Sequence, residues 1–198
     1  WSRKSFDAIH MATLAMLFST GALARVERLD LVRNRFGPAD GSALFDGLGC
    51  GAAPRLHILY LHDTGLGDVG ASALAAALSR GALPKLEALF INDNQLGDKG
   101  LTALAGPLRR RPRLKMLFLG GNRIGDPGLA ALVDNLGDTE LKQLETLFMH
   151  GNQVGDAGCA MLTAAIDGAM LPALTPTFGA NPVAGNPASD AAKQAVFD

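Results

Sequence analysis

Two short polar clusters combine the residue types that could bind a metal ion or exchange a proton. His62 stands beside Asp63, and Asn92 stands beside Asp93 at the same place in a period of 30 residues. An imidazole next to a carboxylate suits a divalent cation or an acid–base pair. His150 lies too many periods away to join His62 on one ion, and no Cys or Glu completes the cluster. We therefore interpret these residues as exposed polar side chains.

The sequence lacks the motifs of the common catalytic centres. No glycine-rich loop resembles a phosphate-binding motif, and no Ser-His-Asp or Cys-His set has the surrounding pattern that such sites require. These observations predict a protein that is not an enzyme and that binds no metal and no cofactor.

The densest run of charge is basic. Arg109–Arg113 holds four arginines and one proline, and Lys115 follows shortly after. Such a run resembles a short nuclear-import signal or a patch for an acidic partner. It stands at the end of an expected helix, where cations complement the negative helix terminus. We interpret it first as a helix end that is capped and solvated.

The elements that position these residues come from an internal repeat of 28 to 30 residues. Its clearest copy is Leu86 to Gly100, which reads L-x-x-L-x-L-x-x-N-x-L-G-D-x-G. The same pattern returns at Leu56, Leu114 and Leu144, and more loosely at Val26. Each copy joins a short alternating strand to an asparagine turn and then to a Gly-Asp step that opens a helix.

This pattern resembles the leucine-rich repeat over nearly the whole chain. Its long helical half is similar to the ribonuclease-inhibitor-like class, which occurs in the repeat domains of Nod-like receptors and Ran GTPase-activating proteins. The resemblance implies an α/β fold, a right-handed leucine-rich-repeat solenoid shaped as a horseshoe arc. A parallel sheet would line the concave face, and helices would cover the convex face.

The repeats predict one domain over residues 1–198. We expect a truncated repeat or helix at 1–25 and a degenerate C-terminal cap at 174–198. The full repeats are expected at 26–55, 56–85, 86–113, 114–143 and 144–173. In the cap, Asn181 with Val183 echoes the asparagine turn, and Ser189 is placed to cap a last helix over 190–196.

The first segment allows two interpretations. Residues 11–24 resemble the apolar core and small-residue end of a signal peptide. Aligning residues 19–27 with 79–87 instead places Leu14 on Leu74 and Phe18 on Leu78, which favours a repeat helix. The same alignment places Trp1 and Phe6 on strand and turn positions of a repeat, so we expect a fragment of a longer solenoid.

Each position that recurs among the repeats has a structural interpretation. Leucines at positions one, four and six point inward from strands that stack about 4.8 Å apart. Asparagine at position nine can donate and accept, so it satisfies the backbone of a buried turn, and a stacked ladder follows. The second repeat has Thr64 at this place. An aspartate after the glycine is expected to cap its own helix; these residues are Asp68, Asp98, Asp126 and Asp156.

The helices are expected to pack on the sheet through one apolar face. In two repeats this face is clear from the spacing of the residues. Its members are Leu101, Leu104, Ala105 and Leu108 in one helix and Leu129, Leu132, Val133 and Leu136 in the next.

Position five of each strand points out of the core toward the concave face. It holds, in order, Asp30, Tyr60, Phe90, Phe118 and Phe148. At the spacing of neighbouring strands the rings would form a column, and exposed aromatic patches are typical of protein-binding sites. We predict a protein-binding surface that also includes Arg28, His62, Asn92, Asp93 and His150. The alternative is that the rings only pack on one another and stiffen the sheet.

Composition limits the classes of partner and the cellular compartment that suit this chain. The chain has 18 basic and 19 acidic residues, so bulk charge favours neither nucleic acid nor membrane. No apolar run reaches the length of about 18 residues that a membrane helix needs. Cys50 and Cys159 lie more than three repeats apart and cannot pair within a solenoid, which favours a reducing, cytoplasmic compartment.

These points predict a non-catalytic module that binds a protein or peptide through its concave face, as part of a larger signalling or receptor-like protein. One alternative is a GTPase-activating protein of the Ran type, in which Arg33, Arg35 or Arg123 would approach a small GTPase. That family ends in an acidic region, whereas this chain ends in SDAAKQAVFD. Another alternative is a structural fragment without its own activity.

Overall fold

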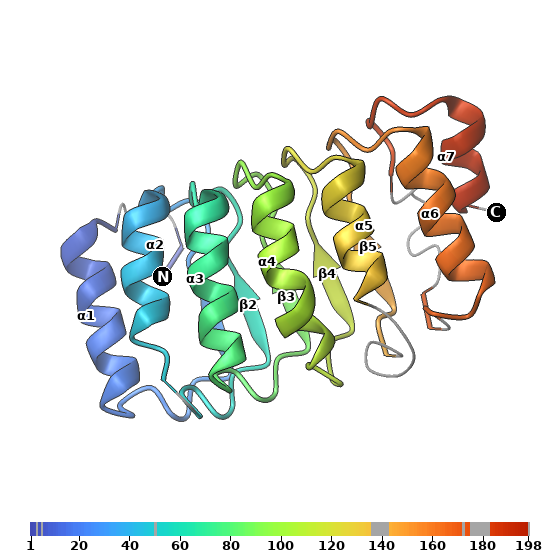
Figure 1. Cartoon of the computed structure of the whole chain (residues 1–198). Coiled ribbons are helices and arrows are strands. Elements are labelled where there is room, and N and C mark those ends of the chain that lie inside the picture. The colour runs from blue at the N-terminus through green and yellow to red at the C-terminus, as the bar shows by residue number, and fades with distance from the viewer. Residues whose placement is uncertain are drawn as a thin grey trace.

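The computed structural model describes residues 1–2, 4, 6–49, 51–135, 143–171, 173–174 and 183–197. Helices and strands alternate along the described chain from α1 to α6, and α7 follows α6 (Figure 1). The strands are β1 (Arg28–Asp30), β2 (Ile58–Tyr60), β3 (Ala88–Phe90), β4 (Met116–Phe118) and β5 (Thr146–Phe148). The helices are α1 (Ala8–Ser19), α2 (Gly37–Asp46), α3 (Gly67–Ser79), α4 (Asp98–Arg109), α5 (Asp126–Asp134), α6 (Asp156–Asp167) and α7 (Asp190–Phe197).

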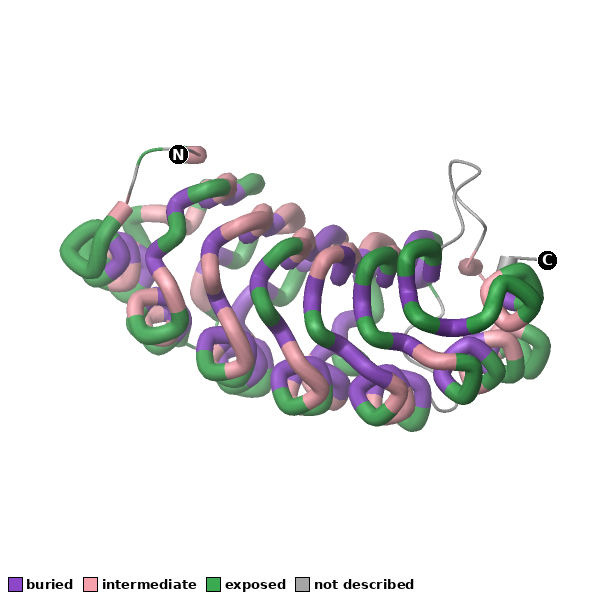
Figure 2. The backbone as a smooth tube through the Cα atoms, turned by 90° about the horizontal axis from the view of Figure 1, so that it is seen from above, coloured by how far each residue is buried: buried purple, intermediate pink, exposed green. Residues whose placement is uncertain are grey.

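The strands form one parallel sheet in the order of the chain, β1-β2-β3-β4-β5. Each residue pairs with the residue at the same place in the next repeat, as Leu59 does with Leu89 and Leu89 with Leu117. The helices form a second layer on the outer curve of the array (Figure 2). The predicted fold class, an α/β arc of strand–helix repeats, is confirmed.

The core lies between the two layers and follows the predicted positions. In the third repeat Leu86, Leu89 and Ile91 are fully buried at positions one, four and six. The predicted apolar helix faces are buried as well in α4 and α5, while Leu136 lies outside the described residues. Because each helix packs on its neighbours as well as on the sheet, the core is continuous from repeat to repeat.

Residues near the N-terminus take the place of a repeat. In α1, Leu14 and Phe18 are buried in the core, as the alignment with α3 predicts. Asn34 accepts from the backbone N–H groups of Lys4 and Phe6 and donates to the carbonyl of Trp1. Within the described ranges, no helix is long and apolar enough to cross a membrane.

The predicted asparagine ladder is present. Asn122 is buried, and its Oδ1 accepts from the backbone N–H groups of Asn94 and Leu96 at 2.9 and 3.0 Å. Its Nδ2 donates to the carbonyls of Ile91 and Leu119 at 3.0 and 2.8 Å. Each side chain therefore closes its own turn and also binds the preceding turn, which joins neighbouring repeats.

The last described member of the ladder is Asn186. Its side chain accepts from Val154 N–H at 2.8 Å and donates to the carbonyls of Met149 and Val183. Asn181 lies outside the described residues. The sequence did not single out Asn186, because the chain after residue 171 has no clear leucine spacing from which to count the register. Ser189 caps α7 through a bond from Ala192 N–H, as predicted.

The aspartates of the Gly-Asp step do not cap their own helices, which corrects a second prediction. Asp98 is the first residue of α4, and its Oδ1 accepts from Gly125 and Gly128 N–H at the start of α5, at 2.7 and 3.0 Å. The other three aspartates likewise accept from backbone N–H groups of the following repeat. The reason is geometric: in the first turn the side chain points sideways, toward the neighbouring helix.

Glycines in the following helix make room for this contact. A Cβ on Gly128 would lie 2.6 Å from Asp98 Oδ1 and 3.0 Å from Asp98 Cα. The same holds at Gly100, where a Cβ would meet Asp68 Oδ1 at 2.6 Å. The G-D-x-G spacing therefore serves two helices at once: the aspartate binds the next helix, and the second glycine receives the aspartate of the previous one.

Thr64 interrupts the ladder and suggests a stabilising substitution. Its hydroxyl lies 3.0 Å from the carbonyl oxygen of Leu61 and 2.8 Å from Asn94 Oδ1. Both neighbours are acceptors, so the hydroxyl serves as a donor here. An asparagine side chain would donate in the same way and would also offer an acceptor. We expect Thr64→Asn to supply an acceptor for the turn of the preceding repeat and to raise the free energy of unfolding by about 1 kcal/mol. Thermal and urea unfolding would measure this gain.

The control for this substitution is Thr64→Val, which keeps the shape but removes the hydroxyl. It should lower stability by about 1 kcal/mol, because the buried hydrogen bond of the hydroxyl is lost, while the Leu61 carbonyl keeps a donor in Asn94 Nδ2. If Thr64→Asn destabilised the protein as Thr64→Val does, the ladder would not extend through this position.

Candidate functional site

Four aromatic rings form a continuous stack across the sheet. Tyr60, Phe90, Phe118 and Phe148 follow one another on β2 to β5, at position five of each strand. Neighbouring ring centroids lie 4.6, 4.5 and 4.9 Å apart, with interplanar angles of 20°, 21° and 27°. All four side chains are half-buried. We call this column the aromatic stripe; its stacking matches the register of the strands.

The stripe begins at Tyr60 and not at the first strand. Asp30 occupies the equivalent place on β1, but its carboxylate accepts from Val32 N–H at 3.1 Å and is bound by its own strand end. Arg28, which is exposed, donates from Nη2 to the Tyr60 hydroxyl at 3.2 Å. Its guanidinium carbon lies 5.8 Å from the Tyr60 ring centroid. Charged side chains of β1 therefore lie at this end of the stripe.

The polar residues at positions seven and eight form a margin beside the stripe, and their contacts join neighbouring repeats. His62 Nδ1 lies 3.2 Å from Asp93 Oδ2 in the next repeat, so the pair forms between repeats and not with the adjacent Asp63. Asn92 Oδ1 accepts from Gly120 N–H at 3.2 Å. The part of the chain that the structure describes contains no group of three residues able to hold a metal ion.

His150 lies apart from His62, the other histidine of the predicted surface, and its imidazole lies over Gly120 in the fourth repeat. A Cβ on Gly120 would lie 2.2 Å from its Cε1, so the imidazole occupies the space that the absent side chain leaves. The ring also meets Phe148 edge to face, with centroids 6.2 Å apart. The structure thus places all ten predicted site residues along one surface, with His62 and His150 in separate surroundings.

On the other side of the stripe, position three holds four residues that the predicted surface did not include. Ile58 and Met116 are half-buried, while Ala88 and Thr146 at the same place are buried. Alternation along the strand could have identified them, because residues two apart share a face. They widen the apolar part of the surface beyond the rings.

The stacking decides which part of each ring faces outward. Phe90 and Phe118 have neighbours on both faces, so only their edges are available to another molecule. Ring edges carry the positive part of the aromatic quadrupole and the faces the negative part. The middle of this surface therefore suits aliphatic side chains and carbonyl oxygens, and Phe90 and Phe118 offer no ring face for a cation.

The three arginines that the Ran-type alternative would use lie on the edge of the arc where each strand leads into the following helix. Arg35 binds the Asp63 carboxylate through Nε and Nη2, at 3.1 and 3.3 Å. Arg123 donates to Gln95 Oε1 at 3.4 Å. Arg33 is exposed in a turn with a positive φ of 59°. Two of the three guanidinium groups therefore already bind other side chains of the protein.

Cys159, the cysteine that the structure describes, is a buried thiol of low reactivity. Cys159 is a free, buried thiol on α6, and Cys50 lies outside the described residues. Burial raises the pKa of the Cys159 thiol, and the nearby carboxylate of Asp156 raises it further. A raised pKa favours the uncharged thiol, which is the less nucleophilic form.

Comparison with known proteins agrees with this architecture. A family profile described as "Leucine Rich repeat" matches residues 54–75, 82–105 and 114–133. These segments include β2 to β4 and most of α3 to α5. No curated protein matches the chain significantly. Residues 54–133 are therefore leucine-rich repeats, and the chain folds as an α/β arc of the leucine-rich-repeat type.

Proposed function

We propose that the protein is a non-catalytic recognition module that binds a protein or peptide through its concave face. One observation carries the proposal, namely the unbroken stack of half-buried rings from Tyr60 to Phe148. Leucine-rich-repeat domains are generally protein-binding modules, and aromatic side chains dominate the binding energy of many interfaces.

The arrangement of the stripe favours binding in a second way. Each ring is held by its neighbours, so less side-chain entropy is lost when a partner arrives. The margin of His62, Asp93 and Asn92 adds hydrogen-bonding groups beside the apolar ridge, as in an interface with an apolar centre and a polar rim. Both features support a partner that lies along the arc and contacts several repeats.

The proposal also includes the larger protein to which the module belongs and its compartment. The long helix in each repeat suits the ribonuclease-inhibitor-like class, and we assign the domain to a larger signalling or receptor-like protein in the cytoplasm. The free, buried Cys159 fits a reducing compartment.

Replacing the two central rings tests the binding surface. We expect the double variant Phe90→Ser, Phe118→Ser to lose partner capture at least about 100-fold, because central aromatic residues each contribute about 2 kcal/mol or more. The assay is a pull-down from cells that express the full-length parent protein, followed by titration of the purified partner. Stability should fall by a few kcal/mol, since three ring contacts are lost.

A matched control removes apolar side chains from the other layer. Val69 on α3 and Ile9 on α1 are exposed, so Val69→Ser with Ile9→Ser should leave capture unchanged. Phe118→Leu keeps apolar volume but breaks the stack. If the ring variants unfolded while Phe118→Leu bound as well as the native protein, the rings would serve packing alone, and the proposal would fail.

The Ran-type alternative has a direct assay of its own. GTP turnover by a Ran-type GTPase would be measured with and without the protein, and the proposed module should produce no acceleration. Robust acceleration that Arg33→Ala abolishes would replace recognition by GTPase activation as the function.

A further inference from the structure

The arginine run at the end of α4 divides into groups with different surroundings. Arg111 is 9% exposed, and its Nη2 donates to the carbonyl of Leu78 in the last turn of α3. Arg110 and Arg113 are exposed, and neither guanidinium makes a hydrogen bond or ion pair to any part of the chain that the structure describes. Capping of the neighbouring helix thus explains Arg111 but not the arginines beside it.

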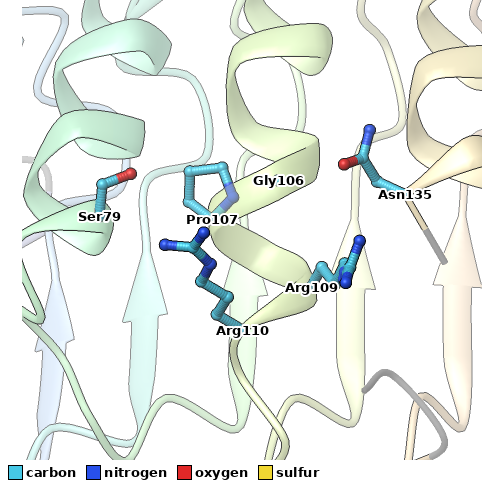
Figure 3. Close-up of a pocket in the computed structure, with 6 residues that line it drawn as sticks. All are labelled: Ser79, Gly106, Pro107, Arg109, Arg110 and Asn135. Atoms are coloured by element: carbon cyan, nitrogen blue, oxygen red, sulfur yellow. The ribbon is translucent and has the colours of Figure 1, made fainter. Parts of the chain in front are cut away.

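A hollow of 430 Å³ opens next to these arginines, between the C-terminal ends of α3, α4 and α5. It is lined by Ser79, Gly106, Pro107, Arg109, Arg110 and Asn135 (Figure 3). The guanidinium of Arg110 lies on the Ser79 side of Pro107, and the side chain of Arg109 extends toward Asn135. The hollow thus combines two guanidinium groups with a hydroxyl and an amide.

The surrounding charge is positive although helices end here. Each helix C-terminus carries about half a negative charge. The guanidinium of Arg111 offsets that of α3, and Arg80 offsets that of α2 by donating to the carbonyl of Phe45 at 3.1 Å. At the end of α4 itself, Arg109 and Arg110 carry two positive charges against its half negative charge, while Asp134 adds one carboxylate at the end of α5. Lys85 and Arg113 are exposed in the loops that follow α3 and α4 on the same edge of the arc.

We propose that this edge binds an acidic segment of a partner protein, with one carboxylate entering the hollow between Arg109 and Arg110. We call the surface the basic edge patch; its residues are Arg80, Lys85, Arg109, Arg110 and Arg113. A guanidinium binds a carboxylate with two parallel hydrogen bonds, and the remaining cations attract further acidic side chains along the segment. This site lies on a different part of the molecule from the aromatic stripe.

The composition of the patch favours a protein over other polyanions. Binding to a membrane surface usually adds apolar side chains that enter the lipid, and single-stranded nucleic acid usually stacks on aromatic rings. Among the described residues, the exposed large apolar side chains are Trp1, Ile9, Met16 and Val69. None of them belongs to the basic edge patch.

The test uses the full chain and a fluorescently labelled peptide of alternating glutamate and glycine, with fluorescence anisotropy as the readout. The double variant Arg110→Glu, Arg113→Glu should bind this peptide at least about tenfold more weakly at about 50 mM salt. The matched control is Lys99→Glu, Arg123→Glu, which makes the same charge change on the opposite edge. Its affinity should stay within about twofold of the native protein.

Three further measurements decide the outcome. A glutamine–glycine peptide should not bind, and circular dichroism should show that both double variants are folded, since the altered side chains are exposed. An equal loss in the control pair would show a general charge effect and overturn the proposal. Tighter binding to phosphatidylserine vesicles than to the peptide, abolished by Arg110→Glu, would also overturn it in favour of a membrane surface.

Discussion

Asn122→Ala is expected to lower the free energy of unfolding by about 4 kcal/mol, because it leaves several buried backbone groups without partners. The Asn122 side chain is the acceptor for Asn94 and Leu96 N–H and a donor to Ile91 carbonyl. Leu119 carbonyl keeps a donor in Asn152, so three groups and not four are orphaned. Urea unfolding followed by far-ultraviolet circular dichroism would measure the loss.

The control for this prediction is Gln153→Ala, which removes an exposed amide from the neighbouring turn. Its effect should remain within about 0.5 kcal/mol, as is usual for surface positions. A loss below about 1 kcal/mol for Asn122→Ala would mean that water or another side chain replaces the amide, and the ladder would then contribute little to stability.

Asp98→Ala is expected to cost about 3 kcal/mol through a contact between repeats. The carboxylate accepts two charge-assisted hydrogen bonds, from Gly125 and Gly128 N–H, at the positive end of α5. Hydrogen bonds to a charged group contribute about 1.5 to 3 kcal/mol each, and the partial exposure of Asp98 keeps the total near the lower end. Hydrogen exchange should show faster opening of the first turn of α5 than of α4.

Two comparisons separate this contact from a general charge effect. Asp134→Ala removes an exposed carboxylate at the C-terminal end of α5, where a negative charge is unfavourable, so stability should be unchanged or slightly higher. Gly128→Ala leaves every charge in place but sets a Cβ 2.6 Å from Asp98 Oδ1, and it should weaken the same contact. If α4 opened before α5 in Asp98→Ala, the aspartate would act on its own helix after all.

Much of the fold could be predicted because the pattern repeats. Copies at Leu56, Leu86 and Leu114 establish the period, and alternation within each strand places Leu59, Leu89 and Leu117 inward. Where the spacing is lost, the ladder could not be followed, and the sequence did not single out Asn186. The proline-rich stretch after residue 171 carries no leucine spacing from which to count.

The candidate surface could be predicted in part for the same reason. Strand register alone places Phe90 beside Phe118, so the column of rings follows from the repeat. The first member of the column could not be judged in this way, because Asp30 is turned back to Val32 N–H. Whether a polar side chain points outward or binds its own backbone depends on rotamers that the pattern does not specify.

The sequence by itself determined the repeat period, the strands and helices, the ladder of asparagines and the column of rings. Each of these depends on spacing within one repeat or on the equivalence of repeats. Only the tertiary structure decided that Asp98 caps α5, that His62 meets Asp93, and that Arg111 caps α3. These contacts join different positions of neighbouring repeats, so they depend on the lateral offset between adjacent helices and turns, which no local pattern contains.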